Sequence, residues 1–485
     1  MADVPSLSPV PAEPTVEQLL ELLAERDRLI AALMEHNASL AARVAELEAR
    51  LSKNSQNSSK PPSSDAFVKP PPRSLRRKSG RKPGKQPGDP GFRLEPRPDP
   101  DRVVLHVPEV CRGCGGDLTA APVVDEERRQ VFDLPPVTPI VIEHRAEQRS
   151  CGCGVVTAAA FPAEATAPTC YGPGVAALGA YLLARQHLPV ERAAECLADC
   201  FGLPVSTGYV ASLLPTAADR VEPFLGLTRK ELAGAEVTNF DETGARVAAA
   251  LCWVHVICTD RYTLYHLDAQ RGQAAMERAG VLPGFTGVAV HDGLAAYRKF
   301  DLVHALCNAH HLRELAGIAE TTGQDWPTRL ADLLVQMHVA VEVAKANGET
   351  ALPARRLATY RRRYDALITE GNTLNPPPPR TGKPGRPTLG PAGALLHRLD
   401  VYRDDVLRFA TDFRVPFDNN QAERDVRMVK LQQKISGGWR SPAGATAFLA
   451  VRSYLSTAAK HGQAALAVLR QLFTGEVWLP ATTGP

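Results

Sequence analysis

The chain has 485 residues, a charged fraction of 22% and a net charge of only +3 at pH 7. This length exceeds what one hydrophobic core normally organises, so we expect several domains. The near balance of charge excludes a chain that is basic throughout, and contacts with nucleic acid must therefore come from local basic segments.

Neither an N-terminal signal pattern nor an apolar run of membrane-spanning length occurs in the sequence, so we expect a cytoplasmic protein without membrane contact. Ten cysteines are too sparse for a disulfide scaffold in so long a chain. Four of them form two close pairs, which in a reducing compartment indicates metal binding.

Residues 1–52 are predicted to form a dimerisation helix. Apolar residues recur at heptad spacing between residues 15 and 51, and Asn37 occupies one of the core positions. A buried Asn in such a seam favours two parallel strands, because paired Asn side chains satisfy each other only in register. We therefore expect a homodimer through a coiled coil. The alternative is an amphipathic helix packed on its own protein.

Residues 53–100 are rich in Pro, Ser, Gly and basic residues, a composition that predicts a disordered linker. Eight Lys and Arg residues fall between positions 69 and 85 without a single acid. Such a block suits the neutralisation of DNA phosphates without reading sequence. A solubilising tether is the alternative.

Residues 101–160 are predicted to form a zinc ribbon. Two cysteine pairs are each followed by Gly, whose freedom at positive φ lets backbone amides point at the sulfurs. The second pair is one residue shorter than the usual knuckle, so His144 is an alternative ligand, and redox-active or idle thiols are the other interpretations. The predicted Zn²⁺ ligands are Cys111, Cys114, Cys151 and Cys153.

Residues 161–232 are expected to form a helical DNA-binding domain. Ser206 or Thr207 would cap a helix that follows a short turn containing Gly202. Helix, turn and helix are compatible with a helix-turn-helix DNA reader. They are equally compatible with helices that are only structural.

Extended sequence follows, with strands predicted at 237–241, 250–257, 262–266 and 288–291. Asp241 and Asp292 each follow a strand and begin a turn that contains Gly, a position that is rigid but open to ligands. Two such carboxylates suit a hard cation such as Mg²⁺. Asp beside Gly after a strand is also very often no more than a turn.

A capped helix is predicted at 418–434, with Asp418 accepting from first-turn amides and Gln421 reaching back. This places Glu423 in the second turn. A carboxylate beside a row of cations suits DNA strand cleavage, whereas the alternative is a solvated helix with an ion pair. The cations on the same face are Arg427, Lys430 and Lys434.

Five motifs occur in the order FDETG (240–244), VHDG (290–293), CNAH (307–310), DNNQAER (418–424) and KISGGWRS (434–441). With the coil, the SKNSQNSSKPPSSD stretch and the paired cysteines, they make the chain resemble the transposases of the insertion sequence sixty-six family. The resemblance implies an α+β multidomain protein. Its RNase H-like α/β catalytic core would span 233–460 with a helical insertion at about 310–410, and a C-terminal tail would follow at 461–485.

The resemblance also implies a DDE transposase that cuts DNA at transposon ends and joins the ends to target DNA. Asp241, Asp292 and Glu423 would be its catalytic triad and would bind two Mg²⁺ or Mn²⁺ ions. The pair Cys307 and His310 is interpreted as structural. DNA and accessory transposition proteins are the expected partners, at the nucleoid. For Arg271 a carboxylate is the alternative partner. The residues expected to contact DNA are Arg271, Arg427, Lys430, Lys434 and Arg440.

The chain departs from the family pattern in the short second cysteine pair, in Asn239 where His is common and in Trp439 where Phe is more usual. None of these positions belongs to the triad. Two rival functions stay open: a catalytically idle dimeric DNA-binding regulator, and a metal-dependent nuclease acting on RNA or DNA junctions. Strand joining would distinguish a transposase from a simple nuclease.

Overall fold

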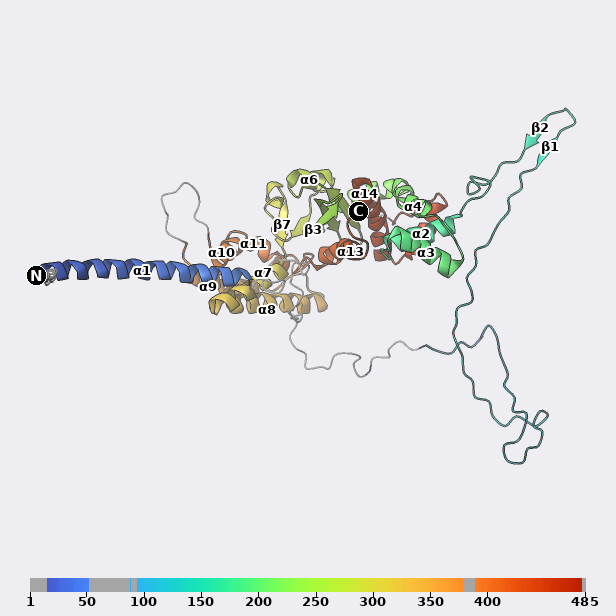
Figure 1. Cartoon of the computed structure of the whole chain (residues 1–485), viewed down its shortest axis with the longest axis horizontal. Coiled ribbons are helices and arrows are strands. Elements are labelled where there is room, and N and C mark those ends of the chain that lie inside the picture. Colours follow the sequence, from blue (N-terminus) through green and yellow to red (C-terminus); the bar gives the residue numbers. More distant parts are fainter. Residues whose placement is uncertain (1–14, 52–87, 89–93, 378–388, 482–485) are drawn as a thin grey trace, which may run out of the picture. The chain divides into compact units, whose positions relative to one another are not determined.

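The computed structural model describes residues 15–51, 88, 94–377 and 389–481 (Figure 1). These residues fall into two compact units. The sheet unit comprises Leu227–Gly244 and Leu251–Val429 together with residues 15–51. The helical unit comprises the described residues of 88–226, Ala245–Ala250 and residues 430–481. The basic block of the predicted linker, at 69–85, lies outside the described residues.

Helix α1 spans Val16–Leu51 without interruption (Figure 1). The apolar residues of its heptad pattern are exposed, among them Leu23, Ile30 and Leu33. The choice between a coiled coil and an amphipathic helix packed on its own protein is not decided by this exposure, and pairing of two such helices stays a prediction.

The sheet has five strands in the described residues, in the order β5-β4-β3-β6-β7. Strand β6 runs parallel to β3 and to β7, whereas β4 and β5 are antiparallel. Short runs such as Val288–His291 are buried throughout, as expected for strands covered on both faces. The strands are β3 Val237–Val247, β4 Ala250–Cys258, β5 Thr263–Asp268, β6 Val288–His291 and β7 Val303–Leu306.

Strand β3 continues past Asp241 to Val247, so the turn predicted directly after Asp241 is wrong. The strand goes on because Ala245 and Val247 are buried at alternate positions. Gly244 does not mark a turn. A Cβ there would stand 3.1 Å from the Leu251 side chain, so the absent side chain lets β4 pack closely.

A group of helices follows β7 and covers much of the insertion predicted at 310–410. Its core surrounds the fully buried side chains of Trp326 and Tyr364. The Tyr364 hydroxyl donates to the carbonyl oxygen of Leu399 at 2.8 Å, which ties α9 to α10. The helices are α7 Asn308–Thr322, α8 Trp326–Ala346, α9 Ala354–Leu374, α10 Pro391–Val401, α11 Arg403–Val406 and α12 Arg408–Thr411.

In the helical unit, the predicted cap of α4 is confirmed, because the Ser206 side chain accepts from the amide of Tyr209 at 3.1 Å. Helix α3 ends at Gly202 with a φ of +61°. The tail expected at 461–485 contains a helix, α15, that packs against α2. The elements are α2 Pro173–Ala184, α3 Val190–Phe201, α4 Thr207–Arg220, α14 Pro442–Lys460 and α15 Ala465–Phe473.

Helix α5 spans Glu222–Ala233, α6 spans Gln273–Arg278 and α13 spans Asn420–Ser436. The short strands β1 (Gln148–Ser150) and β2 (Val156–Ala158) pair antiparallel and form a hairpin. None of the helices in the described ranges combines the length and apolarity needed to cross a membrane.

Candidate active site

Asp241 lies in β3, and Asp292 directly follows the neighbouring parallel strand β6. Asn239 of β3 stands opposite Val290 of β6, so the residues two positions further on continue along the same pair of strands. The turn predicted at Asp292 is present: Gly293 has a φ of +92°, and the Asp292 Oδ1 accepts from the amide of Leu294 at 2.9 Å. Both side chains are half-buried. They therefore lie at one edge of the sheet, fixed in place but reachable.

Helix α13 brings the third carboxylate to this edge through the buried residue Asn419. The Asn419 side-chain amide donates to the carbonyl oxygen of Phe240 at 2.8 Å and accepts from the Asn239 amide at 2.7 Å. Its backbone amide donates to the sulfur of Cys307 at 3.1 Å. The start of α13 is thus fastened to β3 immediately before Asp241, and Glu423 follows one helical turn later.

At the start of α13, only one of the two predicted capping hydrogen bonds is present. Asp418 accepts from the amide of Asn420 at 3.0 Å. The Gln421 side chain instead accepts from Arg424 at 2.5 Å and donates toward Asp425 at 3.5 Å. Gln421 therefore faces along the helix and does not reach back, because Asn419 already holds the helix start to the sheet.

Glu242 is a fourth acid at this edge that the sequence did not single out. Its side chain is fully buried, and it accepts from the Tyr297 hydroxyl and from the Arg271 guanidinium at 3.3 Å. Burial and the charge of Asp292 raise the pKa of Glu242 to about 7, although Tyr297 and Arg271 oppose the shift. The signal available in the sequence was the pair Tyr297 and Arg271, because a Tyr hydroxyl and a guanidinium need hydrogen-bond acceptors when they are buried.

Arg271, expected to contact DNA or a carboxylate, contacts two carboxylates. Besides Glu242, it lies 3.7 Å from the Asp292 Oδ2, and its guanidinium stands 4.8 Å from the ring centre of Trp253. One flat cation thus spans two acids and rests on an aromatic face. In this arrangement the guanidinium offsets part of the negative charge at the edge of the sheet.

The pKa of Asp241 is raised well above its ordinary value, first by burial and then by the charges of Glu242, Asp292 and Glu423. The structure therefore brings the three predicted acids close enough to influence one another. Like charges held together in a poorly hydrated place favour protonation or a bound cation. Carboxylate oxygens are the donors that suit a hard divalent ion. Of the three acids, only Glu423 belongs to the cluster of possible metal ligands found in the described residues, so the structure does not gather the triad into one cluster.

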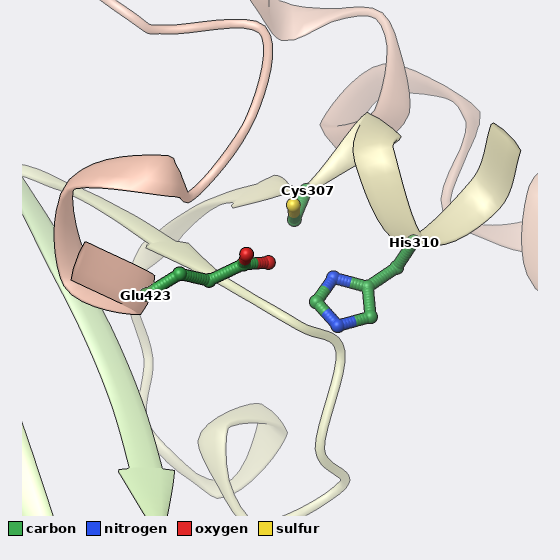
Figure 2. Close-up of side chains that lie close together, drawn as sticks. All are labelled: Cys307, His310 and Glu423. Atoms are coloured by element: carbon green, nitrogen blue, oxygen red, sulfur yellow. The ribbon is translucent and has the colours of Figure 1, made fainter. Parts of the chain in front are cut away.

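The pair Cys307 and His310 lies beside Glu423. Cys307 directly follows β7, and His310 stands in the first turn of α7. Their ligand atoms and a carboxylate oxygen of Glu423 all lie within 4.8 Å of one another (Figure 2). Burial raises the pKa of the Cys307 thiol to about 12. Sequence reasoning interpreted the pair as structural and did not place it here, because β7 was not predicted.

Comparison with known protein families decides the identity. Residues 168–447, more than half of the chain, match the family model described as transposase IS66 family. The chain belongs to this family. Within this transposase, residues 108–154 match the zinc-finger binding domain of transposase IS66, and residues 11–95 match a family of unknown function. A search of curated proteins found no match.

The cysteines of this transposase stand in two turns of the kind a zinc finger uses. The amide of Gly115 donates to the Cys111 carbonyl at 2.9 Å, and that of Gly154 donates to the Cys151 carbonyl at 2.8 Å. Nearby backbone amides, those of Cys114 and Cys153 first, lower the pKa of Cys111 and Cys151, which favours thiolates. The structure does not gather the two pairs, since the cluster of possible ligands found in the described ranges is that of Cys307.

The predicted cations of the transposase lie on and just after α13. Arg427, Lys434 and Arg440 are exposed, whereas Lys430 is half-buried and has its pKa lowered by burial. The alternative interpretation of α13 was an ion pair between Glu423 and Arg427. Glu423 instead pairs with Arg313, whose Nη2 lies 3.2 Å from the Glu423 Oε1. Arg427, Lys434 and Arg440 therefore remain open to solvent.

Proposed function

We propose that this member of the IS66 family is a DDE transposase that cuts DNA at transposon ends and joins the cut strand to target DNA. The proposed metal-binding triad is Asp241, Asp292 and Glu423, with two Mg²⁺ or Mn²⁺ ions. The observation that carries the proposal is the attachment of α13 to β3 through Asn419, because Glu423 follows one helical turn after a residue that is bonded to β3 immediately before Asp241. The strand order, with β6 and β7 parallel to the central β3, supports an RNase H-like core.

The residues at this edge of the sheet would have different roles in the reaction. Asp241 and Asp292 present oxygens from the rigid sheet, and Glu423 adds oxygens from α13. When bound, the ions supply activation of the attacking oxygen and charge stabilisation at the leaving 3′ oxygen. Arg271 steadies Glu242 and Asp292 while the site fills. In-line displacement needs position and charge rather than a nucleophilic side chain, so we expect no covalent protein intermediate.

DNA contact would come from several parts of the chain. The exposed cations Arg427, Lys434 and Arg440 suit the phosphate backbone, which dominates affinity for DNA. The zinc-finger domain and the helices of the helical unit are the candidates for recognising transposon ends. The exposed apolar stripe of α1 suits a parallel homodimer, which would hold two ends in one complex.

An idle regulator would need none of the three acids, so their presence in the chain supports the catalytic proposal over that alternative. A nuclease limited to RNA or DNA junctions shares the core chemistry, so joining of strands is the discriminating activity. Accessory transposition proteins remain part of the proposal as partners for the complete reaction.

The test is cleavage of a duplex that carries the element's end, in Mg²⁺ or Mn²⁺, by wild type and by Asp241→Asn and Glu423→Gln. Each substitution keeps the size of the side chain and removes its charge. We expect both to abolish cleavage and strand transfer while DNA binding in a gel shift survives. Glu342→Gln, an exposed acid on α8, is the matched control and should cleave normally. Cleavage that persists in both triad variants would refute the proposed site.

A further inference from the structure

A group of softer metal ligands stands next to the third carboxylate of the proposed triad. Cys307, His310 and Glu423 offer a sulfur, an imidazole nitrogen and a carboxylate oxygen within 4.8 Å of one another. In Figure 2 the His310 ring turns a nitrogen toward both the sulfur and the carboxylate. A sulfur, an imidazole nitrogen and a carboxylate oxygen that face a common point are the ligand types that Zn²⁺ takes in proteins.

His310 supplies a second observation. Its Nδ1 is buried and, within the described residues, has no hydrogen-bond partner. Buried polar atoms of this kind require an explanation, and an ion that is not part of the coordinates is one of the recognised ones. The nearest candidates to satisfy this nitrogen directly are the Cys307 sulfur and the Glu423 oxygens, with which it shares the cluster.

The neighbours of the cluster also suit metal ligands. The Cys307 sulfur accepts the amide of Asn419 at 3.1 Å, and ligands are commonly held by such outer hydrogen bonds. Glu423 engages Arg313 through Oε1, which leaves Oε2 able to turn toward an ion. A dication would attract the Glu423 carboxylate and would favour the deprotonated form of the Cys307 thiol, because metal ligands bind as thiolates.

Spacing fits a small tetrahedral ion. Cys307 and His310 are separated by two residues across the start of α7, the short interval that zinc knuckles use. Metal bonds of about 2.0–2.3 Å in a tetrahedron require ligand atoms ~3.3–3.8 Å apart, which the observed limit of 4.8 Å approaches closely enough for side-chain rotation to reach. Three protein ligands leave a fourth position open.

We propose that Cys307, His310 and Glu423 form a binding site for a zinc-class transition ion, distinct from the predicted cysteine knuckles. The proposal rests on the proposed function only in assigning Glu423 to the catalytic triad. Thiolate and imidazole select Zn²⁺ or Co²⁺ over Mg²⁺. Such an ion would hold the Glu423 carboxylate in place through the ligands Cys307 and His310. The position of the third acid would then depend on a zinc-class ion as well as on the Mg²⁺ or Mn²⁺ ions proposed for the triad.

The test uses Co²⁺ as the probe in the full chain. A background variant with Cys111, Cys114, Cys151 and Cys153 all changed to Ser removes the zinc-finger ligands. In this background we expect about one equivalent of Co²⁺ to bind with a thiolate-to-metal charge-transfer band, and excess Mg²⁺ should not displace it. The added change Cys307→Ser should abolish the band, and His310→Gln should weaken Co²⁺ binding about tenfold or more. Cys252→Ser, a half-buried cysteine on β4, is the matched control and should keep the band.

Circular dichroism and thermal melts show whether each variant folds, and His310→Gln provides a reading if Cys307→Ser does not. A folded background protein without the band would overturn the site, as would a band that survives both substitutions. The readout needs no DNA. If Cys307→Ser loses the band but the triad variants cleave DNA normally, this metal site is supported and the proposed function is refuted. If the band survives in Cys307→Ser but the triad variants do not cleave DNA, the proposed function is supported and this metal site is refuted.

Discussion

Asn239 and Asn419 are joined side chain to side chain, with the Asn239 amide donating to the Asn419 Oδ1 at 2.7 Å in a buried position. One belongs to the central strand and the other immediately precedes α13. This bond and the one from Asn419 to Phe240 fix where Glu423 lies relative to Asp241. Asn239, a departure from the usual family residue, is thus part of the attachment of α13 to the sheet.

The first prediction concerns this attachment. Asn419→Ala leaves the carbonyl of Phe240 and the amide of Asn239 without their partner, which should lower the free energy of unfolding by about 1–3 kcal/mol. Cleavage should fall further than stability explains, because Glu423 loses its position. Urea unfolding and DNA cleavage measure the two effects. Asn420→Ala, an exposed neighbour, should change stability by less than about 0.5 kcal/mol, and an equal loss in both variants would contradict the role of Asn419.

The second prediction concerns Arg271. Its guanidinium lies against Glu242 and Asp292, where a bound cation would compete with it. Arg271→Ala should tighten Mn²⁺ binding about tenfold, or ~1.4 kcal/mol, while cleavage falls because Glu242 and Asp292 lose a positioning contact. Mn²⁺ titration followed by electron paramagnetic resonance measures the affinity. Arg329→Ala, which removes an exposed ion pair with Glu370, is the control; unchanged or weaker Mn²⁺ binding in Arg271→Ala would count against this interpretation.

The third prediction is a dependence of stability on pH. The Gly293 amide donates to the His291 Nδ1, so the His291 Nε2 carries the proton that bonds to the His304 Nδ1 at 3.0 Å. Burial lowers the pKa of both imidazoles below their ordinary 6.5, and in His291 the shift is large. The folded state therefore binds fewer protons than the unfolded state. This contribution to stability is complete above pH 6.5 and is lost as pH falls below it.

Urea unfolding between pH 8 and pH 5 measures this dependence. His304→Gln should flatten the loss of stability on acidification, because it removes one of the two groups. The exposed His397 serves as the control, and His397→Gln should leave the slope unchanged. A slope that is the same in all three proteins would exclude the pair as its source.

The fourth prediction concerns two consecutive glycines in the helical unit. Trp439 donates its amide to the Arg246 carbonyl at 3.0 Å, and a Cβ on Gly438 would stand 2.8 Å from that carbonyl oxygen. Gly437 meets nothing but has a φ of +74°. Gly437→Ala should cost about 1 kcal/mol through backbone strain alone. Gly438→Ala should cost more, about 1–3 kcal/mol, because backbone must move. Denaturant unfolding followed by circular dichroism compares the two variants, and equal costs would contradict the close approach.

Much of the fold could be predicted where local pattern governs it. The heptad helix, β6, the Ser206 cap and the turn at Asp292 depend on residues within a few positions of one another. The helical runs predicted in the insertion at 330–346 and 353–368 are present as α8 and α9. Helix α8 begins earlier, at Trp326, and α9 begins at Ala354 and ends later, at Leu374, as helix boundaries do when tertiary packing continues them.

The rest depends on contacts between distant residues. Gly244 suggested a turn, but its missing side chain serves packing against Leu251 on the next strand. Strand β7 has only four residues and owes its place to pairing with β6. Without β7, nothing in the sequence could bring Cys307 and His310 to Glu423. The roles of the triad, the coiled coil and the DNA contacts stay predictions.

The attachment of α13 also has a consequence for synthesis. A ribosome adds roughly 5–20 residues per second from the N-terminus, and domains fold as they emerge. The coil and the zinc-finger segment are therefore exposed to the cell before Glu423 has been made. On the proposed function, a nascent or prematurely released polypeptide can occupy transposon ends but cannot cut them. Such fragments would compete with finished copies, so incomplete translation itself would restrain mobility of the element.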